Sequence, residues 1–399
     1  MLKILLKNNL YALSLYSRQI AGTIVIFVIA RYLSVYDYGL FSSYKALALF
    51  WLLFANLGYN EYILVSSQNV VREVRLKIAF FILNAILVLS IIAGISTLMP
   101  LESNLLFILV LLRTFFDGVF FSIALPYFQA SKKFNIISYV NIFYSITMVI
   151  IAIISYVFNL SLVNFLLLNI CLGIFNFIQV SFYAKINYFI ALRHIKELIK
   201  RLDKSIFAYI GVLICSYLYA QIPSLYSSTF IPKEDAALYF AAFTIASVIS
   251  LLITAQVQKI VPEMIKSSIE NIENIIKKEL AFIITINCII FMFFIFTGKL
   301  ILKLLYGQIY YQNAYFILLI LTFSNISIAI AGIYGAYITA SGNQKVKIKM
   351  QFEAIIISIL TLSVFHKLGI YAATLAYLLS ASHIGVRYVL KTKQLLKYK

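Results

Sequence analysis

The chain has 399 residues, of which 63% are hydrophobic and only 12% charged, and its mean hydropathy is +0.97. This composition excludes an ordinary soluble domain, because a protein core cannot hide so much apolar surface from water. The formal net charge is +19, so the positions of the basic residues must show whether they face nucleic acid or a membrane.

About twelve apolar stretches have the ~20 residues that are needed to cross the ~30 Å hydrocarbon core of a bilayer. In chain order they cover residues 10–32, 40–58, 76–98, 105–129, 135–157, 162–184, 205–227, 236–257, 280–298, 311–340, 350–366 and 368–390. The sequence therefore predicts an all-α polytopic membrane protein with about twelve transmembrane helices.

The basic residues are sorted by side of the membrane. With both termini on one side, the loops on that side hold 25 of the 33 Lys and Arg residues, whereas the opposite loops hold five. Basic loops stay cytoplasmic, so we expect a bacterial inner-membrane protein with both termini in the cytoplasm. The charge then reflects topology and contact with anionic membrane lipid, and no nucleic-acid partner is expected.

Several kinds of chemistry are not expected. The three cysteines, Cys171, Cys215 and Cys288, lie inside apolar stretches at no metal-binding spacing, and the three histidines form no cluster in the sequence. No phosphate-binding glycine-rich loop is present, and no loop exceeds about twenty residues, which leaves no room for a soluble catalytic domain. We therefore expect neither an enzyme nor a bound cofactor or metal.

The longest polar stretch, residues 185–204, separates an N-terminal six-helix lobe, 1–184, from a C-terminal six-helix lobe, 205–399. Its apolar residues recur at helical spacing among basic ones, which predicts a basic amphipathic helix on the cytoplasmic face; a plain solvated linker is the alternative.

Two short segments of the first lobe recur in similar form in the second, and these two sequence echoes indicate that the lobes are repeats. The segment 127–132 is echoed by 337–342 at an offset of 210, and 39–41 is echoed by 237–239 at an offset of 198. Since each lobe has an even number of spans, such repeats are parallel. Two parallel six-helix lobes around a central cavity are the plan of a transporter.

Charged residues inside the predicted spans need an explanation, because each costs at least ~2.5–3.5 kcal/mol at the bilayer centre and usually faces a cavity or a partner. They are Arg18, Lys45, Arg113, Asp117 and Glu353. In the alternative interpretations, Arg18 and Lys45 extend to the headgroups, Arg113 and Asp117 neutralise each other one helical turn apart, and Glu353 pairs with Lys349.

Taken together, three cations and one acid give the first lobe an excess of positive charge at membrane depth. With the offset of 198, Lys45 corresponds to Phe243, so the second lobe lacks this excess. We therefore expect an anionic substrate, with Arg18, Lys45 and Arg113 binding phosphate oxygens, and Asp117 or Glu353 serving ion coupling or charge pairing. Polar residues at Asn56, Gln221 and Asn325 are candidates for a hydrophilic cavity, or for helix packing.

Short motifs occur in a fixed order along the chain. They are Arg31-Tyr32-Leu33, Asp37-Tyr38-Gly39-Leu40-Phe41, Asn56-Leu57-Gly58, Gln129-Ala130-Ser131-Lys132-Lys133-Phe134, Val261-Pro262, Leu304-Leu305-Tyr306-Gly307, Tyr311-Gln312-Asn313-Ala314 and Ala340-Ser341-Gly342-Asn343-Gln344-Lys345. In order and spacing the chain resembles the Wzx-type O-antigen flippases. These form the polysaccharide-exporter branch of the multidrug/oligosaccharidyl-lipid/polysaccharide superfamily.

The resemblance implies a two-lobed bundle with a cationic cavity that moves an undecaprenyl-pyrophosphate-linked glycan from the inner to the outer leaflet by alternating access. It also implies O-antigen polymerase and a chain-length regulator as partners. Gln221 departs from the pattern of the family, in which many members look as though they have an acidic residue at this position. Coupling to a proton or to sodium would then involve Asp117 or Glu353 instead.

Three other functions compete with this interpretation. A cation-coupled multidrug exporter of the same superfamily predicts acids in the cavity. An O-antigen polymerase or ligase needs a large periplasmic loop, which this chain lacks. A structural scaffold leaves the three cations unexplained.

Overall fold

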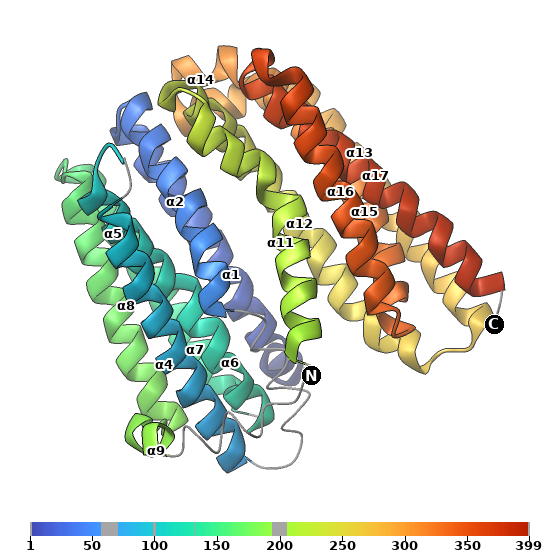
Figure 1. The fold of residues 1–399 in the computed structure, drawn as a ribbon, viewed down its shortest axis with the longest axis horizontal. Helices are drawn as coiled ribbons and strands as arrows, with labels where there is room; N and C mark the ends of the chain where they lie inside the picture. Colours follow the sequence, from blue (N-terminus) through green and yellow to red (C-terminus); the bar gives the residue numbers. More distant parts are fainter. Residues whose placement is uncertain (1, 57–70, 99–100, 132, 194–205, 398–399) are drawn as a thin grey trace. The chain divides into compact units, whose positions relative to one another are not determined.

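A computed structural model describes residues 2–56, 71–98, 101–131, 133–193 and 206–397 (Figure 1). Its regular structure is helical throughout these ranges, with no strand. The predicted spans coincide with the helices α1 (Leu2–Tyr32), α2 (Val35–Asn56), α4 (Val71–Ser96), α5 (Asn104–Thr114) continued by η1 (Phe115–Val119) and α6 (Phe120–Ala130), α7 (Phe134–Val157), α8 (Leu162–Ala184), α11 (Ile206–Phe230), α12 (Lys233–Lys266), α13 (Ile269–Tyr306), α15 (Tyr315–Ala340), α16 (Gln344–Phe365) and α17 (Ile370–Lys397). The predicted fold class is therefore confirmed.

Shorter elements lie between the long helices. They are α9 (Tyr188–Arg193), α14 (Gln308–Asn313) and the 3-10 helix η2 (His366–Leu368). Within the described ranges, nine helices are long and apolar enough to cross a membrane, which makes the chain a multi-pass membrane protein. Of the predicted amphipathic linker 185–204, the part from residue 194 onward lies outside the described residues.

Contacts divide the chain into two compact units. Unit 1 comprises Met1–Ser34 and Tyr44–Leu213, and unit 2 comprises Val35–Ser43 and Ile214–Lys399. In unit 1, α1 packs on α7, α4 on α6, and α8 on both α5 and α7; in unit 2, α15 packs on α12, α13 and α17, and α16 on α17. The first turns of α2 thus pack within unit 2, although the rest of this helix belongs to unit 1.

Helix α7 shows why lipid must surround unit 1. Its exposed face carries large apolar side chains three or four residues apart, namely Tyr139, Phe143, Ile146, Ile150 and Ile153. Its buried face carries the polar residues Ser138, Asn141 and Ser145. A water-soluble helix has the opposite arrangement. Polar residues inside and apolar residues outside are stable only where the surrounding solvent is itself apolar.

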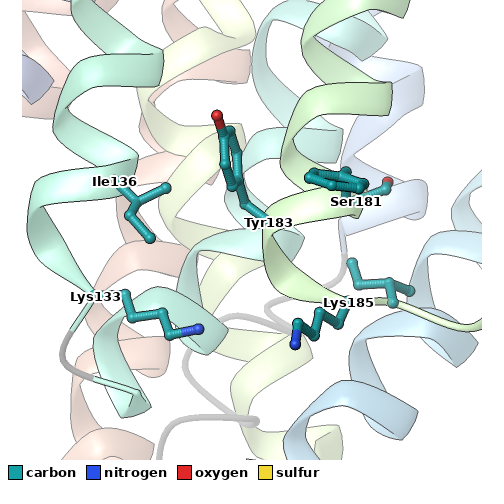
Figure 2. A pocket seen from close by; sticks show the side chains of 7 residues that line it. Lys133, Ile136, Ser181, Tyr183 and Lys185 are labelled. Atoms are coloured by element: carbon teal, nitrogen blue, oxygen red, sulfur yellow. The ribbon is translucent and has the colours of Figure 1, made fainter.

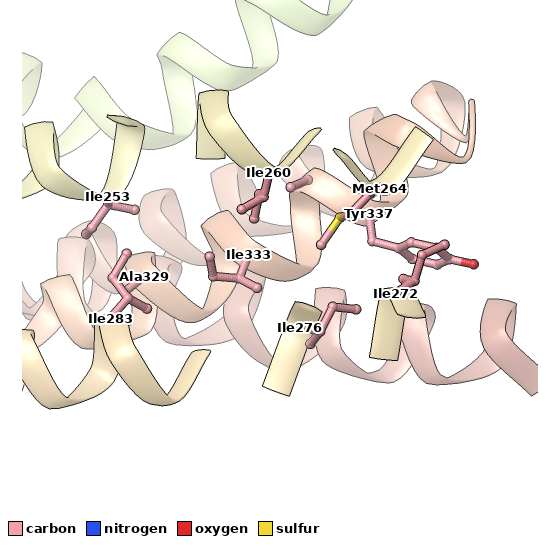
Figure 3. Close-up of a cluster of buried hydrophobic side chains, with 10 residues drawn as sticks. Ile253, Ile260, Met264, Ile272, Ile276, Ile283, Ala329, Ile333 and Tyr337 are labelled. Carbon is pink, nitrogen blue, oxygen red and sulfur yellow. The ribbon is translucent and has the colours of Figure 1, made fainter. Parts of the chain in front are cut away.

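The core of unit 2 lies where α12, α13 and α15 meet (Figure 3). Isoleucines such as Ile253 and Ile260 of α12, Ile276 and Ile283 of α13, and Ile333 of α15 interlock there and are almost fully buried. Helices in lipid are held together chiefly by such close packing, because lipid tails are as apolar as the side chains themselves.

Two motifs that are far apart in the sequence meet in unit 2. The ring of Tyr38, at the start of α2, lies 5.8 Å from that of Tyr306 and 6.1 Å from that of Tyr310, both in edge-on contact. Next to it, a Cβ on Gly39 would collide with the Lys233 carbonyl oxygen and lie 3.3 Å from Ala237 Cβ. Gly39 therefore allows α2 and α12 to touch backbone to backbone, and Gly39 and Ala237 are the first residues of one of the two sequence echoes.

We expect Gly39→Ala to destabilise the protein by about 1–3 kcal/mol, the usual cost of overpacking, because the obstructing atoms belong to backbone. The thermal midpoint of the detergent-purified protein should fall. Gly94→Ala in α4 is the matched control, since no atom lies within 4 Å of its Cβ, and its midpoint should be unchanged or higher. Equal midpoints for the two variants would contradict the packing role of Gly39.

Candidate functional site

Four of the five charged residues predicted to lie inside spans converge in unit 1. Arg18 of α1, Lys45 of α2, Arg113 of α5 and Asp117 of η1 line one cavity of about 210 Å³. The other lining residues are Gly22, Leu49, Thr114, Gly118, Tyr144 and Met148. Three cations and one carboxylate leave the site with two formal positive charges.

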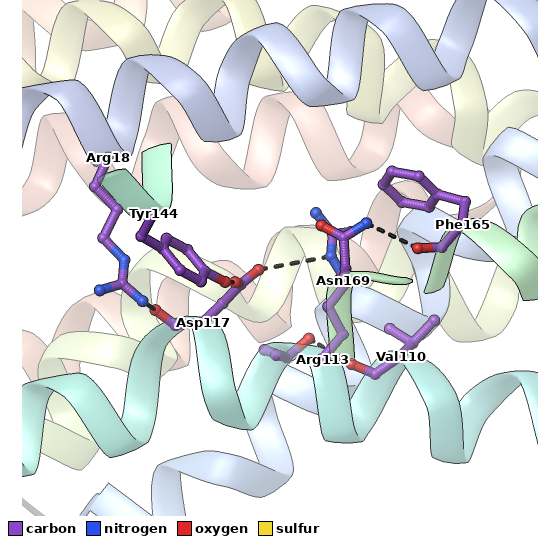
Figure 4. A network of polar contacts seen from close by, with 8 residues as sticks. Arg18, Val110, Arg113, Asp117, Tyr144, Phe165 and Asn169 are labelled. Carbon is purple, nitrogen blue, oxygen red and sulfur yellow. Dashed lines mark hydrogen bonds and ion pairs between the residues drawn. The ribbon is translucent and has the colours of Figure 1, made fainter. Parts of the chain in front are cut away.

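A π-helical turn builds one wall of this cavity. In η1, the amide of Phe120 donates to the carbonyl oxygen of Phe115, five residues earlier. Such a turn widens the helix, takes carbonyls out of the α-helical register and occurs frequently at functional sites. Here the carbonyl of Asp117 accepts a hydrogen bond from Arg18 Nη2, so a guanidinium of another helix binds a carbonyl group of the widened turn (Figure 4).

Aromatic rings hold Arg18 in place. Its guanidinium carbon lies 4.2 Å from the ring centroid of Phe121 and 4.4 Å from that of Tyr144, and Nη1 lies 3.4 Å from Asn141 Oδ1. Cation–π contacts of this kind are worth up to about 2 kcal/mol when desolvated. Arg18 is thus anchored by side chains of other helices in the interior of unit 1.

Asp117 is shared by two partners. Its Oδ2 lies 3.5 Å from Arg113 Nε, and its Oδ1 accepts a hydrogen bond from the Tyr144 hydroxyl (Figure 4). Arg113 is only 6% exposed and also lies over the ring of Phe165, 5.2 Å from its centroid. The intrahelical pairing considered for Arg113 and Asp117 is therefore present, but it neutralises only one of the three cations.

Lys45 is held differently from the two arginines. It lines the cavity within electrostatic range of Arg113 and Asp117, yet its ammonium has neither a hydrogen bond nor an ion pair with any described residue. Among the described residues, Lys45 is therefore the cation of this cavity whose donors have no partner, and an oxyanion in the cavity could accept from it without breaking the Arg113–Asp117 pair.

Tyr144, Asn141, Phe121 and Phe165 were not among the predicted site residues. Asn141 and Tyr144 lie on the buried face of α7, a signal that the polar positions of that span offered. The two phenylalanines gave no signal, because nothing in the sequence distinguishes a ring under a guanidinium from one facing lipid.

The other predicted site residues lie elsewhere. Glu353 of α16, in unit 2, binds Arg387 through two bonds of 2.7 and 2.9 Å and lies 3.4 Å from His383, so its partners are on α17 and the expected pairing with Lys349 is not the one formed. Asn325, also in unit 2, accepts from Ser250 and donates to the Ala246 carbonyl, which joins α15 to α12. A substrate contact at Asn325 stays a prediction.

Gln221 lies half-buried in α11, and Asn56 ends α2 with its side chain outside the described residues. Roles of these two residues in the cavity also stay predictions.

The two units repeat one interhelical contact with different chemistry. In unit 1, Arg18 of α1 bonds Asn141 of α7; in unit 2, Ser216 of α11 bonds Gln351 of α16 at 2.9 Å. Ser216 follows Arg18 by 198 residues and Gln351 follows Asn141 by 210, the same offsets as the two sequence echoes. The corresponding contact in unit 2 thus joins its helices without a cation, and the positive charge of the cavity belongs to unit 1.

The fold and the spans define a multi-pass helical membrane protein, and comparison with solved structures specifies its fold further. The inward-facing form of a multidrug resistance MATE family transporter of the MOP superfamily superposes with a TM-score of 0.62 at 11% identity, over 98% of this chain and 94% of that one. The Vibrio cholerae MATE transporter VcmN in its bent form gives 0.60 at 14% identity, over 98% and 94%. The eukaryotic MATE transporter AtDTX14 gives 0.54 at 12% identity, over 96% and 91%.

The chain therefore has the fold of the MATE transporters. No protein-family model and no curated protein sequence matches it. The first of these structures is described as a member of the MOP superfamily. Membership of this chain in the superfamily expected from the motifs stays a prediction. The Wzx-type branch within it stays a prediction.

Proposed function

We propose that the protein is a membrane transporter that works by alternating access and carries out no covalent chemistry. The MATE-like fold supports transport, and the cavity of unit 1 supports a substrate that carries negative charge. The observation that carries the proposal is the convergence of Arg18, Lys45 and Arg113 on one cavity with a single carboxylate.

The charge of the cavity favours one substrate class. A pyrophosphate offers several oxygen acceptors and negative charge, which match the unused donors of Lys45 and the two positive charges of the site. We propose an undecaprenyl-pyrophosphate-linked oligosaccharide, flipped from the cytoplasmic to the periplasmic leaflet of a bacterial inner membrane, with Asn56, Gln221 and Asn325 facing the glycan. A polymerase and a chain-length regulator would then receive the product.

The second candidate is a cation-coupled multidrug exporter. The comparisons support it better than the flippase, since the relatives with this fold are described as multidrug resistance or MATE transporters. Asp117 is the acid in the unit 1 cavity that could take up a proton or a cation, and Glu353 is a second acid, in unit 2. In this candidate Arg113 and the other cations of unit 1 would position Asp117 and would not bind substrate.

Cells that lack the protein distinguish the two candidates. We expect complete lipid-linked repeat units to accumulate in the cytoplasmic leaflet and surface polysaccharide to be lost, measured by glycan labelling with an impermeant reagent before and after lysis. Efflux of ethidium, a cationic dye, should be unchanged. Normal surface glycan together with ethidium retention would reject the flippase and establish the exporter.

A further inference from the structure

A second cavity, of about 480 Å³, lies in unit 1 at the end where α7 begins and α8 ends (Figure 2). Its lining residues are Lys133, Ile136, Ser181, Phe182, Tyr183, Lys185 and Ile186. None of them lines the cavity around Lys45, so the two cavities are separate features of the unit.

Two lysines enter this cavity from different helices. Lys133 directly precedes α7, and Lys185 ends α8 in the left-handed conformation, with φ of 53°. Figure 2 shows both ammonium groups directed towards the same space, with no acid among the lining residues. Lys133 stands at the N-terminus of α7 and Lys185 at the C-terminus of α8, where the two helix dipoles oppose each other, so the positive potential of the cavity comes from the lysines themselves.

A third cation, Arg75, lies close to Lys133, because both bind the same tyrosine. The buried Tyr127 hydroxyl accepts hydrogen bonds from Lys133 Nζ at 3.2 Å and from Arg75 Nη2 at 3.1 Å. A phenol hydroxyl has two acceptor lone pairs, and two cations occupy them. Because neither bond brings a negative charge, the three cations Arg75, Lys133 and Lys185 attract an anion at this end of the unit.

Apolar side chains border the lysines. Phe182 of α8 is 76% exposed and Phe189 of α9 is 85% exposed. The Tyr188 hydroxyl lies 2.8 Å from Ser181 Oγ, and its ring stacks on Phe177 at 6.0 Å, which fixes the start of α9 beside the cavity. Basic residues next to exposed aromatic ones on a short helix are typical of a segment at the membrane interface.

We propose that this cavity binds an anionic phospholipid from the surrounding leaflet. Lys133 and Lys185 would contact the phosphate, and the acyl chains would lie against Phe182 and Phe189. A soluble anion would use the lysines but not the aromatic side chains, whereas a phospholipid uses both. Basic pockets between transmembrane helices on the cytoplasmic side are suited to such headgroups. The proposal does not depend on which substrate the protein carries.

Native mass spectrometry of the full-length protein, released from micelles with added phosphatidylglycerol or phosphatidylcholine, tests this. We expect phosphatidylglycerol to be retained in preference to phosphatidylcholine. The double variant Lys133→Ala/Lys185→Ala should weaken phosphatidylglycerol binding by about tenfold or more, since each basic residue near the membrane surface contributes about fivefold in affinity. The double variant Lys133→Arg/Lys185→Arg keeps both charges and should bind like the wild type.

Lys299→Ala/Lys303→Ala removes two lysines from α13 and is the matched control, which should bind like the wild type. Equal binding by the wild type and the Lys133→Ala/Lys185→Ala variant would overturn the proposal, as would an equal loss in the control. Thermal stabilisation by inorganic phosphate as large as that by phosphatidylglycerol would also overturn it, because the site would then bind a soluble anion.

Discussion

Replacing Lys45 by methionine is expected to abolish transport and to leave the protein at least as stable as the wild type. The ammonium lines the unit 1 cavity and has no hydrogen bond or ion pair among the described residues, so its removal breaks no polar contact with any of them. Burying a charge without a partner is costly, and methionine keeps the length of the side chain. A contact between a charged group and a substrate oxyanion is worth about 1.5–3 kcal/mol, which is about 10- to 150-fold in affinity.

The measurement is surface glycan in cells together with the thermal midpoint of the purified variant. Lys303→Met, on the exposed side of α13, is the control and should transport normally. Normal transport by the Lys45 variant would remove the cationic site from the mechanism. Lost transport with a much lower midpoint would instead give Lys45 a structural role.

Arg18, unlike Lys45, has partners in the folded chain, because it donates a hydrogen bond to the Asp117 carbonyl and lies between the rings of Phe121 and Tyr144. In the sequence, Arg18, Lys45 and Arg113 are three equivalent positive charges, whereas in the structure each has different partners. The sequence predicts that these charges are present but not which partners they have. Apolar length suffices to predict the helices, because the bilayer imposes it, and the excess of cations in the first lobe indicates where the cavity lies.

The details that govern the chemistry depend on packing. The π-helical turn at Asp117 has no sequence signature and forms where α8 comes close: a Cβ on Gly173 would lie only 2.5 Å from Phe116 Cβ. Glu353 could be expected to pair with Lys349 one turn away on its own helix, and it binds Arg387 of α17 instead. Fork-shaped guanidinium donors match a carboxylate better than an ammonium does, and only the fold brings them together.

A comparison of matching contacts in the two units explains why one unit has this chemistry and the other does not. The contact between the first and fifth helices of each repeat is Arg18–Asn141 in unit 1 and Ser216–Gln351 in unit 2. The second uses neutral groups and attracts no ion, although it holds its helices together in the same way. A serine at position 18 would therefore suffice for packing, and the cost of a buried arginine implies that its charge is used for something other than stability.

The largest effect on stability is expected from Asp117→Leu. This change leaves Arg113, which is almost fully buried, without its carboxylate and removes the acceptor of Tyr144. Breaking a buried ion pair from one side typically costs about 3–5 kcal/mol, because an uncompensated charge remains. The double variant Arg113→Leu/Asp117→Leu removes both charges and should regain much of this stability, since apolar replacement of a whole buried pair is often close to neutral.

Thermal midpoints of the wild type, the two single variants and the double variant form a cycle that isolates the interaction, and surface glycan measured on the same set reports function. We expect the double variant to be nearly as stable as the wild type yet inactive, because Arg113 contributes to the charge of the cavity. Additive midpoints, with the double variant the least stable of the four, would mean that the 3.5 Å pair does not couple and that Arg113 is held by the Phe165 ring and its other neighbours. Full activity of the double variant would show that the transporter needs neither charge, and Lys45 with Arg18 would then be the whole anion site.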